Sequence, residues 1–210
     1  MACVQSFPPK SAKECRKIIE FVDKTNPIIS MMIEFEVLTG LRYSDYSKLK
    51  LSDLMINGQI REEITVVQTK PFSKRVSSGM KEKTARELSK VVVYINEQCR
   101  NVIDEIMFIN NWDAQKDKSK LLFESSRKEG SPYTIQYINQ LLKKAAFALQ
   151  LTYPLSTHSF RKMFATFYIK NGAAIHQVRD ALGQSSLQAT DHYLRTFISE
   201  NKQFATKISF

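Results

Sequence analysis

The stretch Thr157-His158-Ser159-Phe160-Arg161-Lys162 decides how the rest of the chain is interpreted. His158 and Arg161 are three residues apart, so on a helix their side chains lie on one face. Thr157 is a suitable N-cap directly before them, and the N-terminus of a helix attracts anions. The pattern therefore predicts that both side chains point at a negatively charged group. A solvated helix face with two basic residues explains the same stretch equally well. The anion-binding interpretation is therefore favoured only if other segments supply further groups that bind the same anion.

The composition is that of an ordinary soluble globular protein with a basic excess. Of 210 residues, 43% are hydrophobic and 25% are charged, with 31 Lys and Arg against 21 Asp and Glu. The net charge of +10 favours a polyanionic partner such as nucleic acid. A membrane surface also fits the charge. However, the chain has no apolar run of spanning length and no signal peptide, so we expect no membrane association.

The cysteines predict an intracellular protein. Cys3, Cys15 and Cys99 are odd in number and lack the spacing of metal ligands. They are typical of free thiols in a reducing compartment such as the cytoplasm. The sequence also lacks the acidic cluster of a two-metal site. We therefore expect neither a metal ion nor another cofactor.

The first fifty residues predict helices. Residues 1–10 are expected to be a tail, and Ser11–Glu14 is a capping box that begins a helix. Asn26-Pro27 begins a second, apolar helix, which Gly40 ends. Ser44 is expected to cap a short helix that follows.

The next segment predicts a small antiparallel sheet. Leu51–Ile56 and Ile64–Gln68 have the composition of strands, with the turn Asn57-Gly58 after the first. Residues 74–77 are expected to form a third strand. Lys70 then lies at the end of the second strand, beside a turn.

The remainder predicts mainly helices. Thr84 is expected to cap a helix that contains Leu88, Val92, Ile95 and Cys99. Residues 112–118 indicate an exposed loop and residues 121–123 a short buried segment. Further helices are expected to begin at Ser131-Pro132, His158, Ile175 and Ser185-Ser186, and the last of them carries Tyr193. The expected fold is thus mainly α with a small antiparallel β-sheet, as a single domain over residues 11–210.

Separate motifs in this chain resemble, in order and spacing, those of the tyrosine recombinases, the phage integrase family. Thr39-Gly40-Leu41-Arg42, with Asp45 three residues later, resembles the first arginine motif of the family. His158-Ser159-Phe160-Arg161 resembles its His-x-x-Arg motif. Leu182-Gly183-Gln184-Ser185-Ser186, followed by His192-Tyr193, resembles its last box. Lys70 matches the lysine that the family carries on a β-hairpin, although Lys74, Arg75 and Lys81 are close enough to take that role. One such motif alone is weak, but together they cover residues from about 11 to 200.

The resemblance implies a DNA breaking-rejoining fold and strand cleavage through a 3′-phosphotyrosyl intermediate. Tyr193 is the implied nucleophile. Arg42 and Arg161 are implied to bind the non-bridging phosphate oxygens, because guanidinium groups bind them bidentately and stay charged. Lys70 is the implied proton donor to the leaving 5′ oxygen, and His158 accepts the tyrosine proton or binds the phosphate.

Gln184 departs from the family pattern, which usually has His or Trp there. A glutamine amide donates a hydrogen bond but carries no positive charge. The residue therefore leaves open an alternative, a catalytically weak or inactive DNA-binding regulator with the same fold. A helical interaction protein with a basic surface for solubility is a third alternative. Asp45 is expected to support Arg42 rather than to react.

The resemblance also implies partners and an assembly. We expect double-stranded DNA as the partner, a homotetramer on that DNA, and a C-terminal segment, about residues 197–210, that docks in trans on a neighbouring subunit. The family usually places a DNA-clamping domain before the catalytic one, and this chain is expected to lack it. A bacterial or mobile-element origin and a cytoplasmic location follow from the same resemblance.

Overall fold

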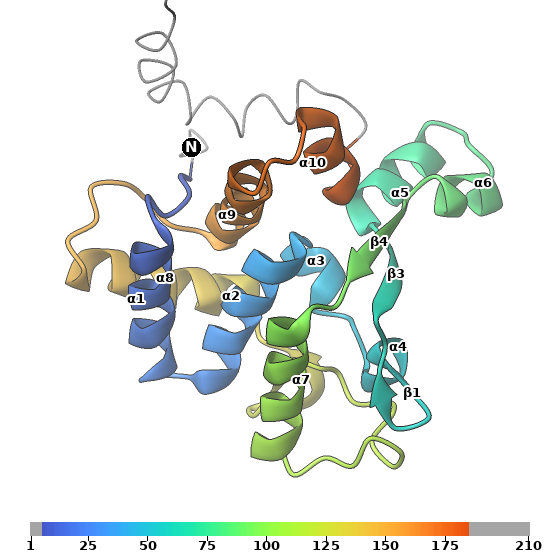
Figure 1. Cartoon of the computed structure of the whole chain (residues 1–210). Helices are drawn as coiled ribbons and strands as arrows, with labels where there is room; N and C mark the ends of the chain where they lie inside the picture. Colours follow the sequence, from blue (N-terminus) through green and yellow to red (C-terminus); the bar gives the residue numbers. More distant parts are fainter. Residues whose placement is uncertain (1–5, 185–210) are drawn as a thin grey trace, which may run out of the picture.

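The structure is a computed structural model that describes residues 6–184 of the chain (Figure 1). Over those residues the chain forms ten helices and six strands. In order they are α1 (Ala12–Asp23), α2 (Pro27–Thr39), α3 (Tyr43–Tyr46), α4 (Leu51–Leu54), β1 (Met55–Ile56), β2 (Gln59–Ile60), β3 (Glu63–Val67), α5 (Thr69–Ser77), α6 (Glu82–Glu87), β4 (Lys90–Tyr94), α7 (Glu97–Ile109), β5 (Glu124–Ser125), β6 (Lys128–Pro132), α8 (Ile135–Ala148), α9 (Thr157–Lys170) and α10 (Ile175–Ala181). The expected class, mainly helical with small antiparallel sheets, is confirmed.

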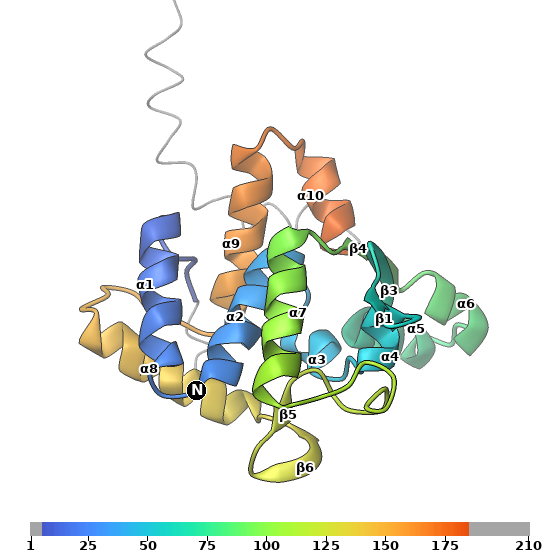
Figure 2. The same ribbon diagram turned by 60° about the horizontal axis from the view of Figure 1, so that its bottom comes forward.

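Helix α2 is the centre of the core. It packs against α1, α7 and α9, and Figures 1 and 2 both show it between α1 and α7. Nearly every side chain of α2 is buried, including the large apolar residues Ile29, Met32, Ile33 and Phe35. Burial of one such side chain contributes roughly 1.5–3 kcal/mol to stability, so α2 is firmly held in the core. The segment after its C-terminus, which leads to Arg42, is therefore held in place as well.

The sequence signals at the two ends of α2 are confirmed. The Asn26 side chain accepts a hydrogen bond from the Ile29 N–H at 3.1 Å, and Pro27 takes the first helical position. Gly40 ends the helix with φ of 65°, in the left-handed region. A Cβ atom at Gly40 would lie 2.5 Å from the ring of Phe164 on α9. The backbone that leads to Arg42 is therefore pressed against α9.

The strands form three separate two-stranded antiparallel sheets. Asn57 and Gly58, with φ of 51° and 79°, join β1 to β2, which is the turn that an Asn-Gly pair favours. Strand β3 pairs with β4, with Glu63 opposite Tyr94 and Val67 opposite Lys90. Strands β5 and β6 form the third pair.

Two sequence predictions around this sheet are wrong. Residues 74–77 belong to helix α5, not to a third strand. The partner of β3 is instead β4, in a segment predicted to be helical from Thr84 onward. The alternating burial of Lys90–Tyr94 shows the period of a strand. Lys70 thus lies in the first turn of a helix, not on a hairpin.

Several helix starts are shifted from the predicted positions. Leu51–Leu54 is a helical turn, so the first predicted strand shortens to β1. Ser44 and Thr84 lie inside α3 and α6, which begin after Arg42 and Lys81. Helix α8 begins after Thr134, because Ser131-Pro132 belongs to β6. Helix α9 is capped at Ser156, one residue before the predicted Thr157.

Three local predictions are confirmed, because Ser11 caps α1, Gly183 follows α10 with φ of 58°, and the side chains of Leu122 and Phe123 are fully buried. Cys15 and Cys99 are free and buried. Within residues 6–184, no helix is long and apolar enough to cross a membrane, and no group of three His, Cys, Asp or Glu side chains is arranged to hold a metal ion.

Candidate active site

Arg161 is anchored in the interior by two backbone carbonyl groups. The residue lies in the second turn of α9 and is fully buried. Its Nη1 atom donates a hydrogen bond to the carbonyl oxygen of Gly40, and its Nη2 atom donates to that of Leu182 at 2.8 Å. Carbonyl groups at the end of a helix lack helical partners, so the end of α2 and the end of α10 supply acceptors. One guanidinium group therefore ties three helices together.

Arg42 lies at the N-terminus of α3 and remains partly accessible. Its side chain is 16% exposed, and its Nη1 atom lies 4.0 Å from Asp45 Oδ2. The other oxygen of Asp45 accepts a hydrogen bond from the Thr69 N–H at 2.8 Å. Asp45 thus links the arginine turn to the start of α5, a position consistent with the supporting role expected for it.

Gln68 connects the two arginines, and the sequence motifs did not identify it. Its Oε1 atom accepts a hydrogen bond from Arg42 Nη1 at 2.9 Å. Its Nε2 atom donates at 2.9 Å to the Leu182 carbonyl, the same oxygen that Arg161 contacts. Gln68 is 1% exposed. The side chains of Arg42 and Arg161 are therefore joined through one amide and one carbonyl.

The turn after α10 fits closely around this amide. A Cβ atom at Gly183 would lie 2.7 Å from Gln68 Oε1. A glycine at this position therefore lets the backbone approach the amide. The signal that could have identified Gln68 is the alternation of β3, because residues 64, 66 and 68 lie on one face and the first two are buried. A polar residue on that face requires internal partners.

His158 and Lys70 border the same region. Desolvation lowers the pKa of His158, and the positive charges of Arg161, Arg42 and Lys70 lower it further, in that order. These three cationic groups therefore lie within electrostatic range of the imidazole. His158 is exposed at the start of α9, and Lys70 is exposed at the start of α5. The structure thus gathers Arg42, Lys70, His158 and Arg161 around one region.

The last box is described only in part. Gln184 lies two residues after Leu182, whose carbonyl is the shared acceptor. The N–H of Gln184 donates a hydrogen bond to the carbonyl oxygen of Arg179 at 3.0 Å. This places the backbone of Gln184 next to the arginine network. Tyr193, the predicted helix after Ser185-Ser186 and the segment 197–210 lie outside the described residues.

A buried carboxyl group lies near Arg161. Glu36 is 1% exposed on α2, and its Oε2 atom accepts a hydrogen bond from the Tyr46 hydroxyl at 3.1 Å. Burial raises the pKa of Glu36 well above its ordinary value, while the Tyr46 hydrogen bond and the charge of Arg161 oppose the rise. The sequence motifs did not identify Glu36. The charge of the buried Arg161 guanidinium gives this carboxyl group a partner inside an otherwise apolar helix.

The arrangement suits a phosphate group. Arg42, Lys70 and His158 are exposed or partly exposed and provide donors for a tetrahedral anion, and the buried Arg161 guanidinium adds positive charge to the same region. Such donors stabilise the extra negative charge that develops during attack on phosphorus.

Comparison with known proteins identifies a family. A family model described as Phage integrase family matches residues 11–200. The chain is similar to tyrosine recombinase XerD of Staphylococcus saprophyticus, with 26% identity over 81% of this chain and 50% of that protein. It is also similar to XerD of Rickettsia bellii, with 29% identity over 79% of this chain and 50% of that protein. The chain therefore spans about half the length of these relatives.

Solved structures share the fold. A crystal structure of XerA recombinase superposes with a TM-score of 0.70 and 18% identity, covering 100% of this chain and 68% of that one. The lambda integrase catalytic core superposes with a TM-score of 0.61 and 19% identity, covering 85% and 91%. The match over residues 11–200 includes the motifs of Arg42, His158 and Arg161. The chain belongs to the phage integrase family, the tyrosine recombinases.

Proposed function

We propose that this chain is the catalytic domain of a site-specific recombinase that cleaves and rejoins DNA strands through a 3′-phosphotyrosyl intermediate. The observation that carries the proposal is the network from Arg42 through Gln68 and the Leu182 carbonyl to Arg161. It brings two cationic groups, 119 residues apart in the sequence, to one place in a member of this family.

The proposed reaction exchanges one phosphoester bond for another. The hydroxyl oxygen of Tyr193 attacks the phosphorus atom, and His158 accepts the phenolic proton. The bond from phosphorus to the 5′ oxygen breaks, and Lys70 gives that oxygen a proton. The reverse reaction, with the 5′ hydroxyl of another strand, rejoins the DNA. The phosphotyrosyl bond conserves the energy of the original phosphodiester bond, so the exchange needs no nucleotide cofactor.

The two arginines have different access to the phosphate. The side chain of Arg42 is partly exposed and can contact a non-bridging oxygen directly. Arg161 is fully buried, so a phosphate reaches it only after the atoms that cover it move. The carbonyl contacts of Arg161 fix the orientation of its guanidinium group.

The proposal includes the partners that such chemistry requires. Double-stranded DNA is the substrate, and a homotetramer on DNA would exchange two pairs of strands. Two similar structures support this part: a lambda integrase dimer bound to a core site and a lambda integrase tetramer bound to a Holliday junction. Trans docking of residues 197–210, a DNA-clamping domain that this catalytic domain works with, and a cytoplasmic location in a bacterium or mobile element complete the proposal.

A suicide substrate tests the reaction. A duplex nicked close to the cleaved bond loses its short leaving strand, so a covalent protein–DNA adduct accumulates. We expect the wild-type chain to form the adduct and Tyr193→Phe to bind the same DNA without forming it. Binding without an adduct in both proteins would overturn the proposal and favour the DNA-binding regulator, the alternative that Gln184 suggested.

A further inference from the structure

Residues 69–89, here called the basic arm, connect β3 to β4 through helices α5 and α6. The basic arm carries six Lys and Arg residues against two Glu residues, a net charge of +4. A tenth of the chain thus holds four of its ten net positive charges. Figures 1 and 2 show the basic arm at the edge of the molecule, on the side opposite α1 and α8.

The basic arm contributes little to the hydrophobic core. Helix α5 has no buried residue and α6 buries only Ala85. The arm is held together by two of its own arginines. The guanidinium of Arg86 lies 5.4 Å from the ring centre of Phe72, and Arg75 Nη1 donates to the Ser89 hydroxyl at 2.9 Å. Packing against the core therefore does not explain why this segment is helical and basic.

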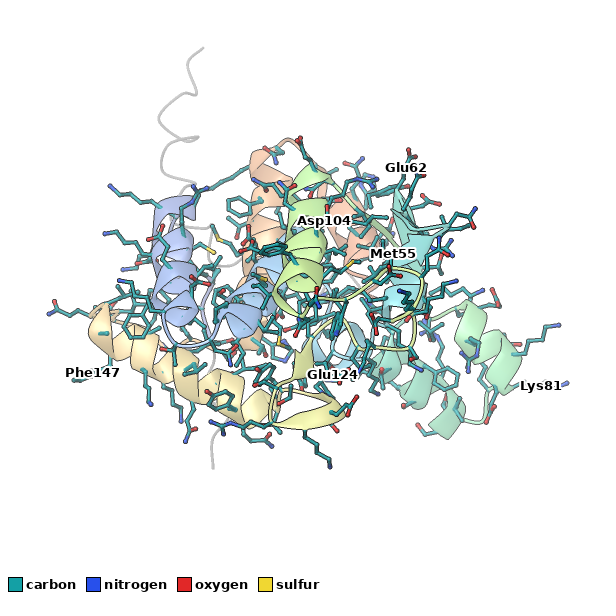
Figure 3. All side chains as sticks on the ribbon, turned by 90° about the horizontal axis from the view of Figure 1, so that it is seen from below. Met55, Glu62, Lys81, Asp104, Glu124 and Phe147 are labelled. Carbon is teal, nitrogen blue, oxygen red and sulfur yellow. The ribbon has the colours of Figure 1, made fainter. Side chains whose placement is uncertain are left out.

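Four lysines of the basic arm are available to a partner. These lysines are exposed and form no ion pair with any residue in the range 6–184. They are Lys70, Lys74, Lys81 and Lys83. Figure 3 shows Lys81 pointing away from the body, at the opposite end of the molecule from Phe147 of α8. These lysines have no carboxylate partner and project from the body of the protein. They can therefore bind a partner whose negative charges are spread along its length.

The basic arm begins at the candidate active site. The N–H of its first residue, Thr69, donates to Asp45, which lies beside Arg42. The charge of the next residue, Lys70, acts on His158. A polyanion that places a phosphate at Arg42 therefore passes close to the start of the arm.

We propose that the basic arm binds the phosphate backbone of duplex DNA beside the cleaved phosphodiester, through Lys74, Lys81 and Lys83. This inference rests on the proposed function, because it takes DNA as the partner. Single-stranded nucleic acid is less suitable, since proteins bind it on aromatic platforms, and the only aromatic ring of the arm, Phe72, is covered by Arg86. A membrane surface is less suitable because Leu88 is the only large exposed apolar side chain of the arm.

The salt dependence of DNA binding tests the inference. All proteins carry Tyr193→Phe, so binding is measured without cleavage. The arm variant is Lys74→Gln/Lys81→Gln/Lys83→Gln. The matched control is Lys13→Gln/Lys17→Gln/Lys24→Gln, which removes the same charge from exposed positions in and directly after α1. The dissociation constant for a duplex is measured over a range of salt concentrations, and thermal unfolding verifies that both variants are folded.

We expect the arm variant to bind more weakly and its plot of log affinity against log salt to be less steep by about 2 to 3, near 0.9 for each lost phosphate contact. We expect the control slope to stay close to that of the parent. Equal slopes in the two variants would overturn the inference, because net charge alone would then account for binding. The adduct assay distinguishes the two failures. If the wild-type chain forms the adduct and the arm and control variants have equal salt slopes, only the inference about the basic arm fails. If the arm variant alone loses slope and the wild-type chain forms no adduct, only the proposed cleavage reaction fails.

Discussion

At the scale of single residues, Gln68 decides how the two arginines are held. Its side chain contacts both Arg42 and the carbonyl oxygen used by Arg161. Its amide is buried, so it has no water to replace a lost partner. A buried donor or acceptor without a partner costs more than the net value of one hydrogen bond. The position of Arg42 should therefore depend on this amide.

Gln68→Leu should slow cleavage while leaving most DNA affinity intact. Loss of a hydrogen bond to a charged group costs about 1.5–3 kcal/mol, so we expect the single-turnover rate of adduct formation to fall about 10- to 100-fold. The control Gln98→Leu changes an exposed glutamine on α7 and should leave the rate unchanged. An unchanged rate in folded Gln68→Leu would show that the amide does not position Arg42.

The pKa of His158 predicts the acid side of the pH profile. Desolvation and the nearby positive charges lower this pKa below 6.5, so the imidazole loses its proton at a lower pH than usual. A reaction that needs the neutral base should therefore rise with pH and reach half its maximum below pH 6.5. The measurement is kcat/KM at low DNA concentration, which reports the free enzyme. A midpoint above 6.5, or an identical acid side in His158→Gln, would contradict this role.

The sequence predicted some residues of the site and missed others for a physical reason. Arg42, His158 and Arg161 stand in short local motifs, so the resemblance of these motifs to the family identified them. Gln68 and Glu36 have no such motif. Their roles depend on partners far along the chain, Leu182 for the first and Arg161 for the second. Only the fold brings these pairs together.

At the scale of elements, the region from β3 to β4 shows where periodicity misleads. Leu88, Val92, Ile95 and Cys99 have helical spacing, yet they belong to different elements, and Leu88 and Val92 are exposed. The run Val91-Val92-Val93 was the better signal, because β-branched residues favour strands. Conversely, Lys74–Ser77 looked like a strand, but no neighbouring strand pairs with it. Caps such as Ser11 and Asn26 were predicted correctly because they are local.

The junction of α2 and α9 depends on Gly40. Gly40→Ala should destabilise the fold by roughly 1–3 kcal/mol, because a Cβ atom at φ of 65° is strained and would also meet the Phe164 ring. Gly172→Ala is the control, since its φ of 89° is also left-handed but its Cβ atom would meet nothing within 4 Å. Urea unfolding measures both. Equal losses of stability would mean that strain alone matters and that contact with α9 does not.

At the scale of the whole molecule, the chain brings four distant segments to one place. The end of α2, the end of β3, the start of α9 and the end of α10 each supply one member of the hydrogen-bonded network. The fold class and the basic charge were predictable from composition and pattern. The convergence itself was predictable only through family resemblance, because no local rule fixes which helices meet.

The central claim is that Arg42 and Arg161 act together on one phosphate, and a double-mutant cycle on the rate of adduct formation tests it most directly. The proteins are wild type, Arg42→Lys, Arg161→Lys and the double variant, because lysine keeps the charge but loses the bidentate geometry. Groups that act as a unit are not additive. We predict that the double variant forms the adduct faster than the product of the two single rate losses implies. The difference corresponds to a coupling free energy of about 1–3 kcal/mol between the two arginines. Single effects that simply multiply would contradict the account.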